Sequence, residues 1–234
     1  MTAIKDATVF ITGANGGLGT QLVKAALYGG ARRVYAASRT TKDWDDERVI
    51  ALQLDLTDPA SIDAAAQQAA DTTILVNNAA TFPRGDLLSA PWDEVTGTIE
   101  ANLTGPLHLT RALADSLRAA KGTLVNINSE LSWFAVGKAH SVSKAGLWMA
   151  TNAFRLEFAA DGVRVLGVYP GAMDTPMQPG EDRTGMMNPA EVAASIYDAV
   201  EADEDELIVG ETAQKVHSAL SAPVTALYPA LASR

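Results

Sequence analysis

The chain has 234 residues, of which 47% are hydrophobic and 20% charged, with no cysteine and a formal net charge of −10. This length and balance predict one globular domain spanning residues 1–234. The lack of cysteine excludes disulfides, thiolate metal sites and a cysteine nucleophile, and the acidic charge argues against nucleic acid as a partner.

The remaining composition excludes two further classes. The N-terminal residues lack the basic and apolar parts of a signal peptide, and no apolar stretch reaches membrane-spanning length, so we expect a cytoplasmic protein without a membrane partner. The three histidines, His108, His140 and His217, do not have metal-ligand spacing, so we expect no metal site.

Strand-like and helix-like segments alternate along the whole chain. Short β-branched or apolar runs predict strands at Ala7–Thr12, Arg33–Ser38, Val49–Leu54, Thr73–Val76, Gly122–Asn128, Val163–Val168 and Glu206–Val209. Segments with helical spacing lie between them, at Gly17–Leu27, Pro59–Ala70, Trp92–Ala119, His140–Ala160 and Pro189–Val200. The pairs Asp58–Pro59 and Asn188–Pro189 are typical of helix starts.

This alternation predicts an α/β protein with a single-domain Rossmann fold. Its sheet is expected to be doubly wound and parallel, with about seven strands and helices on both faces. Ligands of such sheets bind beyond the carboxyl ends of the strands.

A glycine-rich turn joins the first predicted strand to the first helix. It contains Gly13, Gly17 and Gly19, spaced Gly-x3-Gly-x-Gly. Glycines permit a tight turn and let backbone N–H groups approach a pyrophosphate at the helix N-terminus. Any tight strand-to-helix connection also uses glycine, but a turn that follows the first strand and opens a helix favours a dinucleotide site.

The chain resembles the short-chain dehydrogenase/reductase family from about residue 5 to residue 210. The turn matches that family's Thr-Gly-x3-Gly-x-Gly pattern, and further matches follow in the family's order. These are Asp55-Leu56, Asn77-Asn78-Ala79-Ala80 with alanine for the family's last glycine, Asn102, Ser129 and Pro170-Gly171-Ala172-Met173-Asp174-Thr175.

The resemblance implies a nicotinamide dinucleotide cofactor and a set of residues that contact it. These are Gly13, Asn15, Gly17, Leu18, Gly19, Ser38, Arg39, Thr40, Asp55, Leu56, Asn78, Ala79, Ala80, Lys144, Pro170, Gly171, Met173 and Thr175.

The end of the second strand predicts which dinucleotide binds. It reads Ser38-Arg39-Thr40, without the acidic residue with which NAD binders usually bond the ribose hydroxyls. The guanidinium of Arg39 suits a 2′-phosphate, so we expect NADP(H) in preference to NAD(H). The alternative is that Arg39 is an ordinary surface arginine, and Asn15 stands where a second basic residue would strengthen the prediction.

The resemblance also implies a catalytic group formed by Asn102, Ser129, His140 and Lys144. The family uses a tyrosine four residues before a lysine, and here the segment His140–Lys144 reads His-Ser-Val-Ser-Lys. Histidine therefore stands at the tyrosine position, and the step from Ser129 to His140 is about two residues shorter than usual in the family.

His140 and Lys144 are expected one helical turn apart, on one face of a helix. The ammonium of Lys144 and an oxidised nicotinamide would both lower the pKa of His140, leaving a mostly neutral imidazole that is a poor proton donor at pH 7. Three interpretations stay open: weakened carbonyl reduction, reduction of C=N bonds in an already protonated substrate, and a redox-inactive nucleotide-binding or scaffold protein. In the last, His140 is only a helix-start residue or an engineered replacement.

The substrate is expected to be a small, largely apolar molecule. The residues expected to line its pocket are Phe82, Leu131, Trp133, Phe134, Met173, Met177 and Met186, with Arg84 and Asp174 as polar contacts; core packing is the alternative for each. A Gly- and Pro-containing segment, residues 176–188, predicts a short lid. The helices at Trp92–Ala119 and His140–Ala160 correspond to the family's usual dimer surface, which implies a homodimer or homotetramer.

Overall fold

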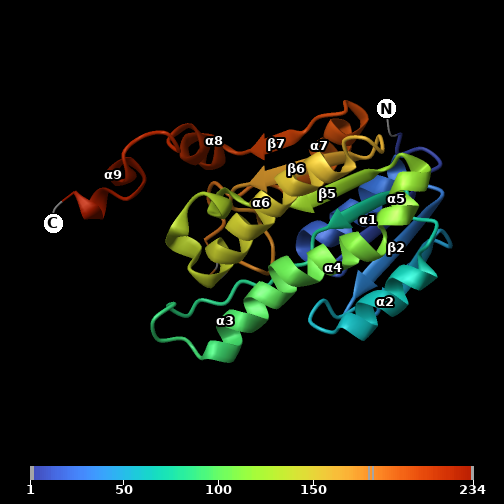
Figure 1. Cartoon of the computed structure of the whole chain (residues 1–234), viewed down its shortest axis with the longest axis horizontal. Helices are drawn as coiled ribbons and strands as arrows, with labels where there is room; N and C mark the ends of the chain where they lie inside the picture. Colours follow the sequence, from blue (N-terminus) through green and yellow to red (C-terminus); the bar gives the residue numbers. More distant parts are fainter. Residues whose placement is uncertain (1–2, 179, 181, 233–234) are drawn as a thin grey trace.

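The computed structural model describes residues 3–178, 180 and 182–232, which form two helical layers around a central parallel sheet (Figure 1). The strand order is β3-β2-β1-β4-β5-β6-β7. The strands are β1 (Thr8–Thr12), β2 (Arg33–Ser38), β3 (Val49–Gln53), β4 (Ile74–Asn77), β5 (Thr123–Ile127), β6 (Arg164–Pro170) and β7 (Glu206–Val209). Each strand predicted from the sequence is confirmed, with ends that differ by no more than two residues.

The helices alternate with the strands as expected. They are α1 (Gly17–Tyr28), α2 (Pro59–Gln68), α3 (Trp92–Ile99), α4 (Gly105–Ala112), α5 (Ala114–Ala120), α6 (Ala139–Phe158), α7 (Pro189–Glu201), α8 (Glu211–Ser218) and α9 (Val224–Leu227). Shorter turns are the π-helix η1 (Glu100–Thr104) and the 3₁₀-helices η2 (Glu130–Ser132), η3 (Ala135–Gly137) and η4 (Pro229–Leu231). The carboxylate of Asp58 and the amide of Asn188 cap α2 and α7.

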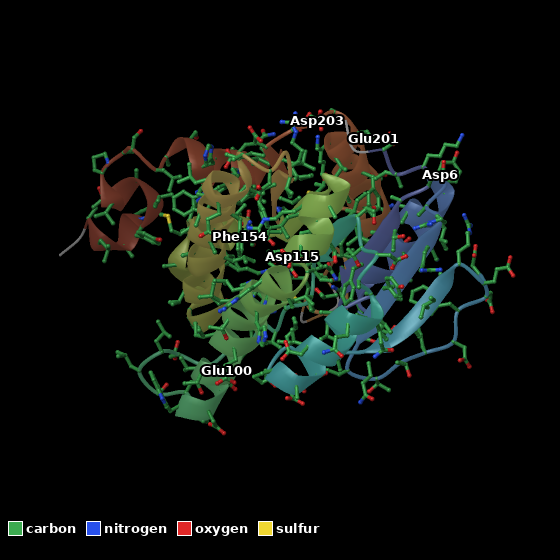
Figure 2. The ribbon with its side chains drawn as sticks, turned by 45° about the vertical axis from the view of Figure 1, so that its right-hand side comes forward. Asp6, Glu100, Asp115, Phe154, Glu201 and Asp203 are labelled. Atoms are coloured by element: carbon green, nitrogen blue, oxygen red, sulfur yellow. The ribbon has the colours of Figure 1, made fainter. Side chains whose placement is uncertain are left out.

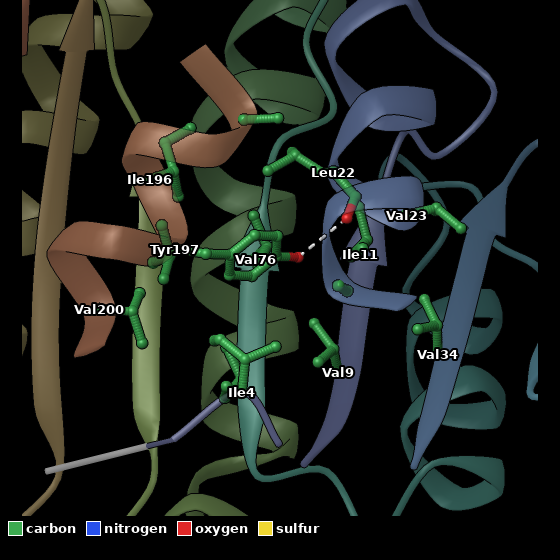
Figure 3. Packing of buried hydrophobic residues seen from close by; sticks show 14 of the residues in the cluster. Ile4, Val9, Ile11, Leu22, Val23, Val34, Val76, Ile196, Tyr197 and Val200 are labelled. Carbon is green, nitrogen blue, oxygen red and sulfur yellow. Dashed lines mark hydrogen bonds between the residues drawn. The ribbon is translucent and has the colours of Figure 1, made fainter. Parts of the chain in front are cut away.

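Alternate residues of the strands feed two separate cores. Val9 and Ile11 of β1 pack with α1 and α7, whereas Phe10 packs with α2, α4, α5 and α6 on the opposite face. Figure 3 shows the first of these cores, where the Tyr197 hydroxyl of α7 donates a hydrogen bond of 3.2 Å to the carbonyl oxygen of Leu22 in α1. The predicted Rossmann fold is confirmed.

The segment predicted as one helix, Trp92–Ala119, is divided into α3, η1, α4 and α5. Pro106 lacks an N–H and cannot bond to the carbonyl of Asn102, so the helix widens there. The N–H of Gly105 instead donates to the carbonyl of Glu100, five residues earlier. Asn102 lies fully buried on this widened turn.

The helices α8 and α9 were not predicted from the sequence. Both helices are short, Ala213 and Val216 are the buried residues of α8, and α9 has no buried residue, so neither offers an apolar run long enough to identify a helix in a sequence. In the described part of the chain no helix is long and apolar enough to cross a membrane.

The strand order reverses between β1 and β4. From β1 the chain builds outward through β2 and β3, and then returns to β4, which pairs with the other side of β1. The helices that follow β1 and β4 lie on opposite faces of the sheet, and the loops that lead to them adjoin at its carboxyl edge, where open α/β sheets bind ligands.

Candidate active site

The glycine turn after β1 is joined to the loop after β4 by hydrogen bonds. Thr12 accepts at Oγ1 from the backbone N–H groups of Asn78 and Ala79, each at 2.9 Å, and the Asn78 amide donates to the carbonyl of Thr12 at 2.8 Å. Gly13 has φ +65°, and a Cβ on it would lie 2.8 Å from Cα of Ala79. The two motifs form one rigid unit.

The first turn of α1 has the features of an anion site. The helix begins at Gly17 without a capping side chain and without an acidic residue, so its first N–H groups remain available to a ligand. A Cβ on Gly17 would lie 2.7 Å from Cβ of Thr175, so the glycine turn meets the segment after β6 here. These residues fit a dinucleotide pyrophosphate.

Gly19 packs against the turn that precedes it. A Cβ there would lie 2.1 Å from the carbonyl oxygen of Gly13, so the turn itself requires glycine at this position. The expected cofactor contact of Gly19 would be made by its backbone and stays a prediction.

The end of β2 carries two cations rather than one. Arg39 is exposed, and Thr40 is held by the Asn15 amide and the Ser38 hydroxyl, which donate to its carbonyl at 2.5 and 2.8 Å. Lys42, which the sequence did not single out, lies with Nζ 3.3 Å from Thr20 Oγ1 on α1. The fold thus places a second basic side chain beside α1, the helix that follows the glycine turn.

Asp55 and Leu56 are engaged in the fold around them. The Asp55 carboxylate accepts from the N–H and hydroxyl of Thr57 at 2.9 and 2.8 Å, and these bonds lower its pKa. Leu56 is buried beside Gly105, whose Cβ would lie 2.3 Å from the Leu56 carbonyl oxygen.

The other residues expected at the cofactor lie along the same edge of the sheet. Leu18 is buried in α1, Ala80 is half-buried after β4, and Pro170 ends β6. Gly171 donates its N–H to the Val209 carbonyl, and Met173 forms a β-bridge with Met187.

His140 lies in the first turn of α6 and is 4% exposed. Its Nδ1 atom is 2.8 Å from the carbonyl oxygen of Thr81. A carbonyl can only accept, so Nδ1 carries the proton, and the neutral ring presents Nε2 as an acceptor. No described residue is hydrogen-bonded to Nε2.

Asn102 bonds to Thr81, the residue whose carbonyl fixes this tautomer. Its Oδ1 accepts from the N–H of Thr81 at 2.7 Å, and its Nδ2 donates to the Thr81 carbonyl at 2.9 Å and to Ser143 Oγ at 3.0 Å. Both amide hydrogens are therefore used, so the 3.3 Å approach of Asn102 Nδ2 to His140 Nδ1 is a contact rather than a hydrogen bond. The sequence predicted Asn102 but not Thr81.

The surroundings of His140 disfavour its charged form. Burial, and to a smaller extent the charges of Lys144 and Arg84, lower the pKa of His140 to about 4. Lys144 is 3% exposed and donates from Nζ to the Ile127 carbonyl at 2.6 Å, while burial lowers its pKa to about 8. The imidazole is neutral at pH 7.

Ser129 stands apart from this hydrogen-bonded group. It is half-buried at the end of β5, and its hydroxyl accepts from the N–H of Leu131 at 3.1 Å. Within the described chain no hydrogen bond joins it to His140. Lys144 connects Ser129 and His140 indirectly. It lies one helical turn after His140, and its Nζ donates to the carbonyl of Ile127, two residues before Ser129.

The expected pocket residues divide into two groups. Phe82 stacks on His140 with ring centroids 4.3 Å apart, and Arg84 lies over Phe82 and donates to the Met177 carbonyl at 3.2 Å. Trp133 instead packs between Tyr169 and other rings in a buried cluster, so we remove it from the pocket.

The remaining pocket and lid residues contact other parts of the chain. Phe134 stacks on Tyr228 near the end of the chain, and Leu131 packs against Gly137. Met186 is half-buried, and Asp174 forms an ion pair with Arg183. Within the predicted lid, Pro179 and Glu181 lie outside the described residues. Among the described residues no three metal-ligating side chains gather.

Comparison with known proteins decides the family. Residues 7–184 match the family model described as short chain dehydrogenase. The chain belongs to the short-chain dehydrogenase family. It is 32% identical over 181 residues, 73% of this chain, to an NADPH-dependent 1-acyldihydroxyacetone phosphate reductase of Schizosaccharomyces pombe.

Other members of the short-chain dehydrogenase family match more of the chain. A ketoacyl reductase of Nostoc is 29% identical over 90% of this chain and 81% of its own length. A Burkholderia cenocepacia short chain dehydrogenase, solved in complex with NADP, is 32% identical with a TM-score of 0.89 over 99% of both chains. The match to the S. pombe reductase spans 61% of that protein's length, below two thirds.

Proposed function

We propose that the chain is an NADPH-dependent reductase that transfers hydride to the C=N bond of a small, largely apolar substrate, with His140 in place of the family's tyrosine. The observation that carries the proposal is the 2.8 Å contact between His140 Nδ1 and the Thr81 carbonyl. It makes the free nitrogen of the ring an acceptor, which suits a substrate that brings its own proton.

The cofactor part of the proposal is supported by the geometry of the site and by the cofactors named for related proteins. The N-terminus of α1 at Gly17 and the adjoining Thr175 would hold the pyrophosphate and nicotinamide portions, and Arg39 with Lys42 the 2′-phosphate. The S. pombe relative is named as NADPH-dependent and the Burkholderia neighbour contains NADP. When bound, NADPH supplies the hydride.

The residues around His140 set what the substrate must provide. The Nε2 lone pair accepts a hydrogen bond from the N–H of a protonated imine, and the amine product leaves without needing a proton from the protein. Ser129 orients the reacting group, and Lys144, fixed by the Ile127 carbonyl, holds the ribose hydroxyls.

Carbonyl reduction is the second candidate, since the Nostoc relative is named as a ketoacyl reductase. A ketone needs an acid, and with a pKa of about 4 the imidazolium makes up roughly one molecule in a thousand at pH 7. That scarcity adds about 4 kcal/mol to any step that uses the charged form.

Rates with two matched substrates test the proposal. NADPH oxidation would be followed with 3,4-dihydroisoquinoline, a cyclic imine, and 1-tetralone, a ketone with the same bicyclic skeleton. We expect the imine to be reduced at least tenfold faster, and His140→Ala to cost less with the imine than with the ketone. Faster reduction of the ketone would contradict the proposal. No turnover by the native chain, but turnover by His140→Tyr, identifies a protein that has lost its chemistry.

We also propose that the chain forms a homodimer or homotetramer through α6. Val142, Met149 and Leu156 are spaced by seven residues on this helix and are 51%, 59% and 81% exposed, which makes an apolar stripe. A different face of α6 contributes to a groove of about 560 Å³, which is lined by residues of α4, α5 and α6, including Asp115 and Phe154 (Figure 2). Phe154 is about 20 Å along α6 from His140, so the groove is separate from the candidate active site.

A further inference from the structure

A half-buried glutamate, one of whose carboxyl oxygens has no partner among the described residues, lies directly after Ser129. Glu130 begins η2, and its Oε2 atom is buried without a hydrogen-bond partner among the described residues. Burial alone raises the pKa of Glu130, and no basic side chain offsets it. A carboxylate oxygen that is buried without a donor or a counter-ion is costly, so its presence in the fold needs a reason.

The carboxyl group of Glu130 lies against the segment that follows β6. A Cβ on Gly171 would lie 3.2 Å from Glu130 Oε2, so the carboxyl group lies against the backbone that follows β6. Ser129 and Gly171 follow β5 and β6, which are neighbouring parallel strands. The carboxyl group therefore stands between the segment that carries Ser129 and the segment that leads to Thr175.

Two neighbours of Glu130 are also without partners. Ser132 Oγ and Trp133 Nε1 are buried without a hydrogen-bond partner among the described residues. Trp133 packs in the buried ring cluster with Tyr169, so its indole N–H belongs to the core. Glu130 is the ionisable group in and beside η2 with which a bound cation would pair.

We propose that Glu130 is the specificity-determining residue of this site and binds the positively charged nitrogen of the substrate, an iminium ion or the ammonium form of its product. A cationic N–H partner relieves the unpaired carboxylate through a charge-assisted hydrogen bond, whereas a neutral ketone leaves it unpaired. A protonated cyclic imine has one N–H, which donates to His140 Nε2, so Glu130 pairs with the positive charge of the imine; the ammonium product has two N–H groups and donates to both acceptors. The assignment to an iminium substrate rests on the proposed C=N chemistry.

Equilibrium binding tests this inference without turnover. 1,2,3,4-Tetrahydroisoquinoline, a cation at pH 7, and neutral 1-tetralone would each be titrated calorimetrically into the chain saturated with NADP⁺. We expect Glu130→Gln, which keeps the side-chain shape, to weaken binding of the amine at least tenfold, or about 1.4 kcal/mol, and to change 1-tetralone less than twofold. Glu204→Gln, an exposed change before β7 at the opposite edge of the sheet, is the matched control and should change neither.

Glu130→Asp provides a second variant that keeps the charge, and it should retain a preference for the amine over 1-tetralone. Equal weakening of both ligands by Glu130→Gln, unchanged amine binding, or no amine binding by the native chain would each overturn the inference. Its outcome is separable from that of the proposed function. Amine binding that depends on Glu130, in a chain that does not reduce 3,4-dihydroisoquinoline, keeps the role of Glu130 and removes the proposed reaction.

Discussion

The Nδ1 atom of His140 and the carbonyl oxygen of Thr81 lie 2.8 Å apart, joining the start of α6 to the loop after β4. Asn102, on the π-helix η1, bonds to both the N–H and the carbonyl of Thr81 and so keeps that carbonyl in place. The carbonyl of Thr81 therefore fixes Nδ1 as the donor and Nε2 as the acceptor of the His140 ring before any substrate binds, and this limits the chemistry that His140 can perform.

Histidine ¹⁵N NMR checks this assignment directly. At pH 7 we expect His140 to be neutral with the proton on Nδ1, and to titrate near pH 4, because burial disfavours its charged form. The chain has three histidines, so the spectrum of His140→Asn identifies the signal. Asn102→Ala should release Thr81 and increase the Nε2–H form. A native ring protonated mainly on Nε2 would contradict the assignment.

Ketone reduction should depend on acid. The pKa of His140 is lowered, so the imidazolium grows as pH falls toward about 4, and the rate with 1-tetralone should rise about tenfold from pH 7 to pH 6. His140→Tyr should raise the rate at pH 7 and remove this dependence, provided that the short segment from Ser129 leaves room for the ring. A ketone rate that is independent of pH and unchanged in His140→Ala refutes an acid role for His140.

The two cations at the end of β2 should set cofactor preference. We expect NADPH to bind more tightly than NADH, and Arg39→Ala or Lys42→Ala each to weaken NADPH about tenfold with little effect on NADH, because only a 2′-phosphate contact is lost. Lys24→Ala, an exposed lysine further along α1, controls for net charge. Fluorescence titration of both cofactors into the native chain and the three variants measures these affinities. Equal weakening of both cofactors would indicate a structural role instead.

The glycines of the turn should separate binding from folding. Gly17→Ala places a Cβ against the movable side chain of Thr175, so the protein should fold but bind NADPH at least tenfold more weakly. Gly19→Ala places it 2.1 Å from a backbone carbonyl, so unfolding free energy should fall by about 2 kcal/mol or more. Thermal unfolding and NADPH titration distinguish them; a Gly19→Ala protein of native stability would show that the turn can move.

The apolar stripe on α6 should hold the oligomer together. Met149→Glu puts a charge at the middle of the stripe, and we expect it to yield monomers in size-exclusion chromatography with light scattering. Gln68→Glu adds the same charge at an exposed site on α2 and should leave the oligomer intact. A native chain that is monomeric at micromolar concentration, or a Met149→Glu chain that remains oligomeric, would place the interface elsewhere or exclude it.

Much of the fold was predictable because its signals are local. The runs Arg33–Ser38 and Glu206–Val209 were predicted to the residue, and the caps at Asp58 and Asn188 mark the helix starts. The break of the long helix around Gly105 and Pro106 was missed, although the proline was visible, because the widened turn also depends on close packing against Leu56. Helix α8 was missed because it buries only two of its residues.

The sequence by itself determined the order of the motifs, the glycine turn and the presence of histidine four residues before Lys144, because each depends on neighbours along the chain. Only the tertiary structure decided which nitrogen of His140 is protonated, that Lys42 lies against α1, that Trp133 lies in the core and that Glu130 Oε2 is buried without a partner among the described residues. Hydrogen-bond partners and burial come from segments distant in the sequence, and those partners and that burial set tautomers, pKa values and unpaired charges.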